Sequence, residues 1–226
     1  MIAAPERHDL EISDAKSWFG PDSMAPVYAL NELLLSLLDA ERLRPASENR
    51  VQLALELSEG MQRLDAEGHR RLASCPIALV DAGFLDEGRW HAAIASSAAP
   101  TQTEALRGRF PYQAASRLAL MALTLASTTS QVSLERACLV FGMSPGCARL
   151  FARLSLPVLE SLAERHADWV RPRWEHRPRV WQTMLELAER PLPSGVPPIG
   201  FRAMQLQLGE LALATPICAA TRQIRR

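Results

Sequence analysis

Apolar side chains recur every three or four residues along most of the chain, and this spacing predicts amphipathic helices. Strict alternation of apolar and polar residues, the pattern of a half-buried strand, does not extend beyond a few residues. The sequence therefore predicts an all-α protein built as a helical bundle. The expected helices cover residues 27–44, 47–72, 86–96, 112–126, 133–141, 144–154, 155–167, 180–190 and 201–214.

Prolines, serines and glycines set the expected ends of several helices. Pro26 precedes the first helix and Pro45 stops it, because proline has no backbone N–H to donate within a helix. Ser133 and Ser144 are the expected N-caps of two short helices, and Gly142 is the expected stop between them. These three residues predict a hairpin of short helices.

Two further segments interrupt the helical pattern. The long second helix has two candidate break points, Gly60 and Gly68. Residues 169–174 are expected to be irregular or extended, because Pro172 and Pro178 break helical hydrogen bonding there.

Composition shows that the chain is long enough for a sizeable core. Its 226 residues are 48% hydrophobic and 22% charged, which excludes a disordered chain, a collagen-like repeat and a disulfide-dense scaffold. One large domain or two small ones fit this length. The expected division is a loose leader (1–26), an acidic helical region (27–98), a linker (99–111), a basic helical module (112–214) and a C-terminal tail (215–226).

Charge is distributed unevenly between the two halves, although the net charge is zero. Residues 1–106 carry 9 basic and 17 acidic side chains, a net charge of −8, whereas residues 107–226 carry 16 and 8, a net charge of +8. All 16 basic residues of the second half are arginines. Either the two halves neutralise each other across an internal interface, or the second half meets a polyanion.

Neither a membrane span nor a metal or cofactor site is expected. The longest apolar run is interrupted by Asn31 and Glu32, and a span needs roughly 20 apolar residues. The N-terminus lacks the apolar core of a secretory signal, so we expect a cytoplasmic protein. The four cysteines are not spaced as zinc ligands, and buried, reduced thiols are expected instead.

One motif raises the question of catalysis. Residues 142–146 match G-x-S-x-G, the nucleophile elbow of serine hydrolases, with Ser144 as the nucleophile. That motif follows a buried strand, whereas residues 134–141 have helical periodicity and Ser144 is the expected cap of a helix. We therefore expect no catalytic residues and no enzyme, with the Ser144 hydrolase as the weakest alternative.

The hairpin over residues 133–154 has the outline of a helix–turn–helix motif. Its second helix bears Arg149 and Arg153, and DNA readers of this type insert the second helix into the major groove. Arginine binds both phosphates and guanine edges, so both residues are candidate DNA contacts. An ordinary helical hairpin in a bundle would show the same pattern.

A second candidate lies between residues 165 and 181, where arginines alternate with tryptophans. Guanidinium groups bind phosphates, and indole rings offer stacking or anchoring surface. Core tryptophans and internally paired arginines are the alternative. The candidate phosphate contacts are Arg171, Arg173, Arg177 and Arg179, and the candidate partner-binding residues are Trp169, Trp174 and Trp181.

Residues 134–148 (LERACLVFGMSPGCA) and 154–164 (LSLPVLESLAE) resemble FlhD, the smaller subunit of the bacterial flagellar master activator. The segment Pro172–His176 occupies the place of the Phe-Arg-Phe-Asp-Asp segment of that family, and the likeness covers about residues 112–214. It implies an all-α dimerising module that works with FlhC, the subunit that carries zinc and much of the DNA contact. The chain departs from the family at Leu139–Val140, where a basic contact is missing, and at Val170, where the family has a cysteine.

Two functions follow as expectations. The first is a non-enzymatic, FlhD-like transcriptional regulator that dimerises and contacts DNA with a protein partner, as a homodimer or hetero-oligomer. The second is a cytosolic interaction or accessory component of a secretion or motility apparatus, in which the same arginines and tryptophans bind a protein.

Overall fold

The computed structural model describes residues 19–42, 60–96, 110–190 and 198–214, which are mostly helical. The all-α prediction is confirmed at this level. Within these residues the helices are α2 (Pro21–Arg42), α4 (Ala66–Ala73), α5 (Glu87–Ala95), α7 (Tyr112–Val132), α8 (Leu134–Phe141), α9 (Pro145–Phe151), α10 (Leu156–Arg165), α11 (Pro178–Glu189) and α12 (Pro198–Ala214), with a 3-10 turn, η1 (Ala167–Trp169), and the strands β1 (Val80–Asp81) and β2 (Arg171–Pro172).

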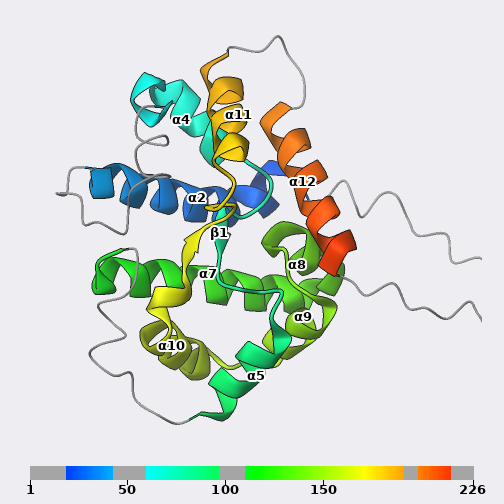
Figure 1. The fold of residues 1–226 in the computed structure, drawn as a ribbon. Helices are drawn as coiled ribbons and strands as arrows, with labels where there is room; N and C mark the ends of the chain where they lie inside the picture. The colour runs from blue at the N-terminus through cyan, green and yellow to red at the C-terminus, as the bar shows by residue number, and fades with distance from the viewer. Residues whose placement is uncertain (1–18, 43–59, 97–109, 191–197, 215–226) are drawn as a thin grey trace, which may run out of the picture.

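Helices α2 and α7 run across the middle of the molecule, and the other elements pack around them (Figure 1). α8, α9, α10 and η1 pack against α7, and α4 packs against α2 and α11. The interior face of α7 is made of small and leucine side chains, including Leu118, Ala122 and Ala126, which are fully buried. Small side chains on a central helix let its neighbours approach closely.

The acidic region and the basic module share a single core. Buried side chains of α2, α4 and residues 75–84 belong to the same hydrophobic cluster as those of α7 to α12. The predicted regions 27–98 and 112–214 therefore do not have separate cores. The predicted leader up to residue 18, most of the linker (99–109) and the tail (215–226) lie outside the described residues.

The helix ends predicted from local sequence are confirmed around the hairpin of α8 and α9. The Ser133 hydroxyl accepts a hydrogen bond from the Arg136 N–H, and the Ser144 hydroxyl accepts one from the Cys147 N–H. Gly142 ends α8 with a φ of 64°, in the left-handed region that glycine adopts without strain. The two short helices and their turn thus lie where the sequence predicts.

The start of α2 differs from the prediction, because Pro26 lies inside the helix and not before it. Pro26 costs the helix one backbone hydrogen bond. Tertiary contacts offset this loss: Met24 is fully buried, and Arg136 on α8 donates to the Ser23 carbonyl oxygen. Residues 21–26 therefore form the first turns of α2, anchored by Met24, and not part of a loose leader.

The break in the second predicted helix falls at neither candidate glycine. A helical turn covers residues 60–63, and α4 begins anew after Asp65. The Asp65 side chain accepts a hydrogen bond from the Gly68 N–H, as an N-cap does. Gly68 therefore lies in the first turn of α4.

The sequence pattern did not predict the two-stranded antiparallel sheet. Val80 of β1 pairs with Pro172 of β2, and Asp81 pairs with Arg171. Only β2 lies within residues 169–174, the segment predicted to be irregular or extended. Two-residue strands are too short to show alternation. Asn31 on α2 supports the approach to β1: its amide group donates to three carbonyl oxygens between residues 73 and 77, and its oxygen accepts from the Leu79 N–H.

Candidate binding cleft

A cleft of about 550 Å³ lies where the small sheet, the turn after β2 and the end of α12 meet. Hereafter it is called the cleft. Three of the four arginines predicted as phosphate contacts are in its wall. Its lining residues are Asp81, Leu85, Gly142, Arg171, Pro172, Arg173, Trp174, Glu175, His176, Arg177, Glu210 and Leu213.

Arg173 contributes to the wall of the cleft from the interior of the protein. It is only 4% exposed, and its guanidinium donates to the carbonyl oxygens of Val80 and Phe141 and to the Gln207 side chain. Burial lowers the pKa of this guanidinium, and the negative charges of Asp81 and Glu210 oppose that shift. The prediction that Arg173 holds a phosphate is therefore wrong, because its guanidinium is buried and bonds to groups inside the molecule.

Arg171 extends from β2 along the rim and is held by two carboxylates. Its Nε and Nη2 atoms each lie 3.1 Å from Oδ2 of Asp81, and its Nη1 atom lies 3.5 Å from Oε1 of Glu175. Asp81 is fixed in turn, because its Oδ1 accepts a hydrogen bond of 2.9 Å from the Gly83 N–H. A carboxylate from the acidic half thus pairs with an arginine of the basic half.

Glu210 on α12 joins the other side of the cleft to the turn after β2. Its Oε1 atom accepts a hydrogen bond of 2.9 Å from Nε1 of Trp174 and lies 3.2 Å from Nη1 of Arg177. Trp174 is almost fully buried, so its ring packs against its own chain. Arg177 is a rim residue with one carboxylate partner.

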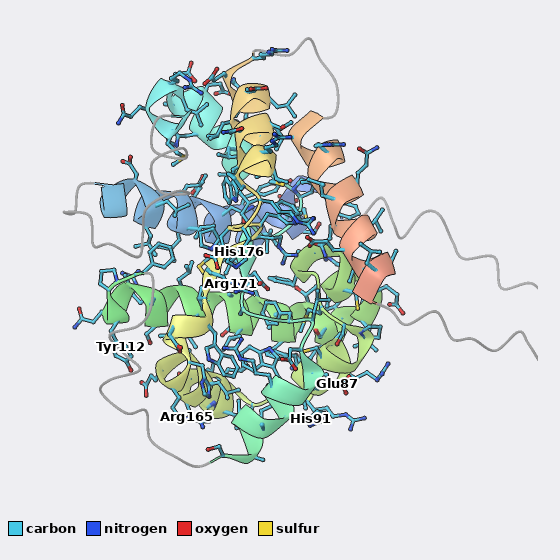
Figure 2. All side chains as sticks on the ribbon, in the orientation of Figure 1. Glu87, His91, Tyr112, Arg165, Arg171 and His176 are labelled. Atoms are coloured by element: carbon cyan, nitrogen blue, oxygen red, sulfur yellow. The ribbon has the colours of Figure 1, made fainter. Side chains whose placement is uncertain are left out.

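Apolar side chains complete the wall between these charged groups. Leu213, on the last turn of α12, is 86% exposed, and Leu85 is also exposed. Pro172 and Trp174 provide buried apolar surface beside them. Arg171 and His176, both labelled near the middle of Figure 2, line the cleft.

The remaining two tryptophans do not form a free partner-binding surface. Trp181 is a core residue whose Nε1 donates to the Arg173 carbonyl oxygen. The prediction that it contacts a partner is therefore wrong, because its side chain is buried. Trp169 is half-buried: the guanidinium carbon of Arg89 lies 3.5 Å from its ring centroid, and the His166 ring stacks on it. Both indoles are engaged within the chain.

Three predicted arginines remain at the surface: Arg149 on α9, Arg153 just after it, and Arg179 on α11. Each is exposed. Their backbones make hydrogen bonds, as when the Thr183 hydroxyl donates to the Arg179 carbonyl oxygen, but within the described part of the chain none of the three guanidinium groups makes an ion pair or a hydrogen bond. None of the three lines the cleft. The structure thus separates them from Arg171 and Arg177.

The N-terminus of α9, which a helix–turn–helix reader would direct at the bases, is covered by α5. A side chain at Gly146 would overlap the carboxylate of Glu87, and both Gly146 and Cys147 are buried. Recognition helices contact base edges through their N-terminal residues. In this arrangement Gly146, Cys147 and Ala148 are buried, and the exposed residues of α9 are Pro145, which has no donor to offer a base, and Arg149.

Ser144 has the geometry of a helix cap and follows helix α8 instead of a strand. This matches the prediction of a turn between helices at G-x-S-x-G. Among the described residues, no group of three His, Cys, Asp or Glu side chains is arranged to hold a metal ion. Within the same residues, no helix is both long and apolar enough to cross a bilayer.

Comparison of the chain with protein-family models, with curated proteins and with solved structures gave no match. The resemblance of residues 112–214 to FlhD therefore stays a prediction.

Proposed function

We propose that this chain is a non-enzymatic protein-interaction module that docks a segment of a partner protein in the cleft. Of the two functions that the sequence leaves open, we favour the second, an accessory component of a secretion or motility apparatus. One observation carries the proposal: the arginines of the cleft are already paired with carboxylates and lie beside exposed leucines.

A nucleic acid is a poor match for such a wall. Binding to a phosphate chain depends on arginines and lysines that neutralise successive phosphates. Here Asp81, Glu175 and Glu210 lie within 4 Å of Arg171 or Arg177 and balance their charge, so the wall lacks the row of unpaired cations that a chain of successive phosphates requires. Protein interfaces, in contrast, combine apolar anchors with arginines and a polar rim.

The proposal is tested by isolating the full-length chain at low salt together with whatever binds it. We expect a defined protein in constant proportion, and little absorbance from nucleic acid. Leu213→Asp should abolish this co-purification, whereas Leu208→Asp should retain it, because Leu208 is exposed on the same helix but lies outside the cleft. Co-purifying nucleic acid, or equal loss in both variants, contradicts the proposal.

DNA binding is a second candidate, and the exposure of Arg149, Arg153 and Arg179 favours it. If the chain binds DNA, alanine at all three positions should weaken binding to every sequence. The slope of log affinity against log salt should fall by about 3, roughly one for each lost phosphate contact. Unchanged affinity and slope would remove these arginines from any DNA contact.

A further inference from the structure

The wall of the cleft presents its positive charges outward and holds its negative charges beneath them. The Arg171 side chain is 41% exposed, against 27% for Asp81 and 19% for Glu175. Arg177 is 54% exposed, against 22% for Glu210. An approaching ligand therefore meets guanidinium groups first, although the three arginines and three carboxylates of the lining cancel in formal charge.

These guanidinium groups are held in place before any ligand arrives. Arg171 is fixed by Asp81, which is bound to the Gly83 N–H, and Arg177 is held by Glu210, which is bound to Trp174 Nε1. Each guanidinium has five N–H donors, so donors remain for an incoming carboxylate. An arginine already fixed in its binding orientation loses less side-chain entropy when a ligand binds.

The apolar part of the wall sets a second requirement on the ligand. Leu85 and Leu213 are large, exposed and located beside the buried rings of Pro172 and Trp174. A segment with apolar side chains on one face would remove both leucines from water, at about 25 cal/mol per Å² of apolar surface. A small anion alone would leave this surface exposed.

Building on the proposed function, we infer that the cleft takes an amphipathic segment of a partner protein that carries aspartate or glutamate beside leucine or aromatic residues. Arg171 and Arg177 bind its carboxylates, and Leu85 and Leu213 pack against its apolar side chains. Complementary charge selects the segment and fixes its register, while the apolar contact adds affinity.

The probe is a random library of twelve-residue peptides displayed on phage, selected against the full-length chain. We expect the recovered sequences to combine acidic with leucine or aromatic residues and to bind in the cleft. For a synthetic peptide of the recovered sequence, Arg177→Glu should raise the Kd at least about tenfold. Arg179→Glu is the matched control, because Arg179 is exposed nearby but does not line the cleft, and it should change the Kd less than about twofold.

A charge exchange gives the decisive result. Lysine in place of the acidic residue of the peptide should abolish binding to the wild type and restore binding to Arg177→Glu. Recovered sequences that are basic or uncharged, and whose binding still depends on Leu213, would overturn the inference that the partner segment is acidic. They would leave the proposed protein-docking function intact. Recovery of no sequence that distinguishes the wild type from Leu213→Asp would overturn both.

Discussion

At the scale of single residues, the buried guanidinium of Arg173 joins β1, the end of α8 and α12 through its hydrogen bonds. Replacement by methionine keeps much of its volume but leaves the carbonyl oxygens of Val80 and Phe141 unpaired. We expect Arg173→Met to lower the free energy of unfolding by about 3 kcal/mol, measured by urea denaturation. Arg179→Met, at an exposed site, should change it by less than about 0.5 kcal/mol. Equal stability of the two variants would contradict this role.

Two buried thiols make stability depend on pH in the alkaline range. Burial raises the pKa of Cys75 and of Cys147 from 9.0 to about 12. Above about pH 9 the unfolded chain releases these protons and the folded chain keeps them, so the free energy of unfolding falls as pH rises from about 9 to 12. Each thiol contributes at most about 1.4 kcal/mol per pH unit in this window.

The measurement for the thiols is urea denaturation at a series of pH values. The double variant Cys75→Ala/Cys147→Ala should show a shallower decline than the wild type above pH 9, whatever its stability at neutral pH. Parallel declines in the two proteins would show that these thiols are not shielded from ionisation.

At the scale of elements, the turn between α8 and α9 depends on a glycine. At Gly142 the left-handed φ of 64° disfavours any other residue, and an added Cβ would overlap the guanidinium of Arg173 and the Gln207 side chain. Gly142→Ala should therefore destabilise the protein by about 1–3 kcal/mol in thermal or urea unfolding. Gly209→Ala, within α12, meets open space and should stabilise by up to about 1 kcal/mol. A Gly142→Ala variant more stable than the Gly209→Ala variant would contradict this account.

The contrast between predicted and missed features follows the distance between partners in the sequence. The hydroxyls of Ser133 and Ser144 each bind the backbone N–H three residues further along the chain, so local sequence is enough to predict both caps. The pairing of Val80 with Pro172 and the burial of Arg173 depend on residues far away in the chain. The sequence predicts the arginine–tryptophan segment as a candidate site, but its composition does not distinguish a buried guanidinium from an exposed one.

At the scale of the whole molecule, contacts between the two halves explain part of their opposite charges. Arg171 pairs with Asp81, while Arg136 and Arg165 donate to carbonyl oxygens of the acidic half. The first of the two interpretations of the charge pattern, neutralisation across an internal interface, thus accounts for Arg171, whereas Arg136 and Arg165 bond to the acidic half without neutralising its charge. Arg149, Arg153 and Arg179 remain at the surface, as do Arg117, Arg190 and Arg202 among the described residues.

A shared core predicts that the described parts of both halves unfold together. Leu34 on α2 is fully buried in the cluster that also contains Trp181, so its loss should destabilise the distant module as well as its own helix. We expect Leu34→Ala to lower the free energy of unfolding by about 2–5 kcal/mol. The fluorescence of Trp169, Trp174 and Trp181, followed in a Trp18→Phe/Trp90→Phe background, and far-UV circular dichroism should give the same shifted midpoint. Two transitions, with the fluorescence midpoint unchanged, would mean that the halves fold independently despite their packed interface.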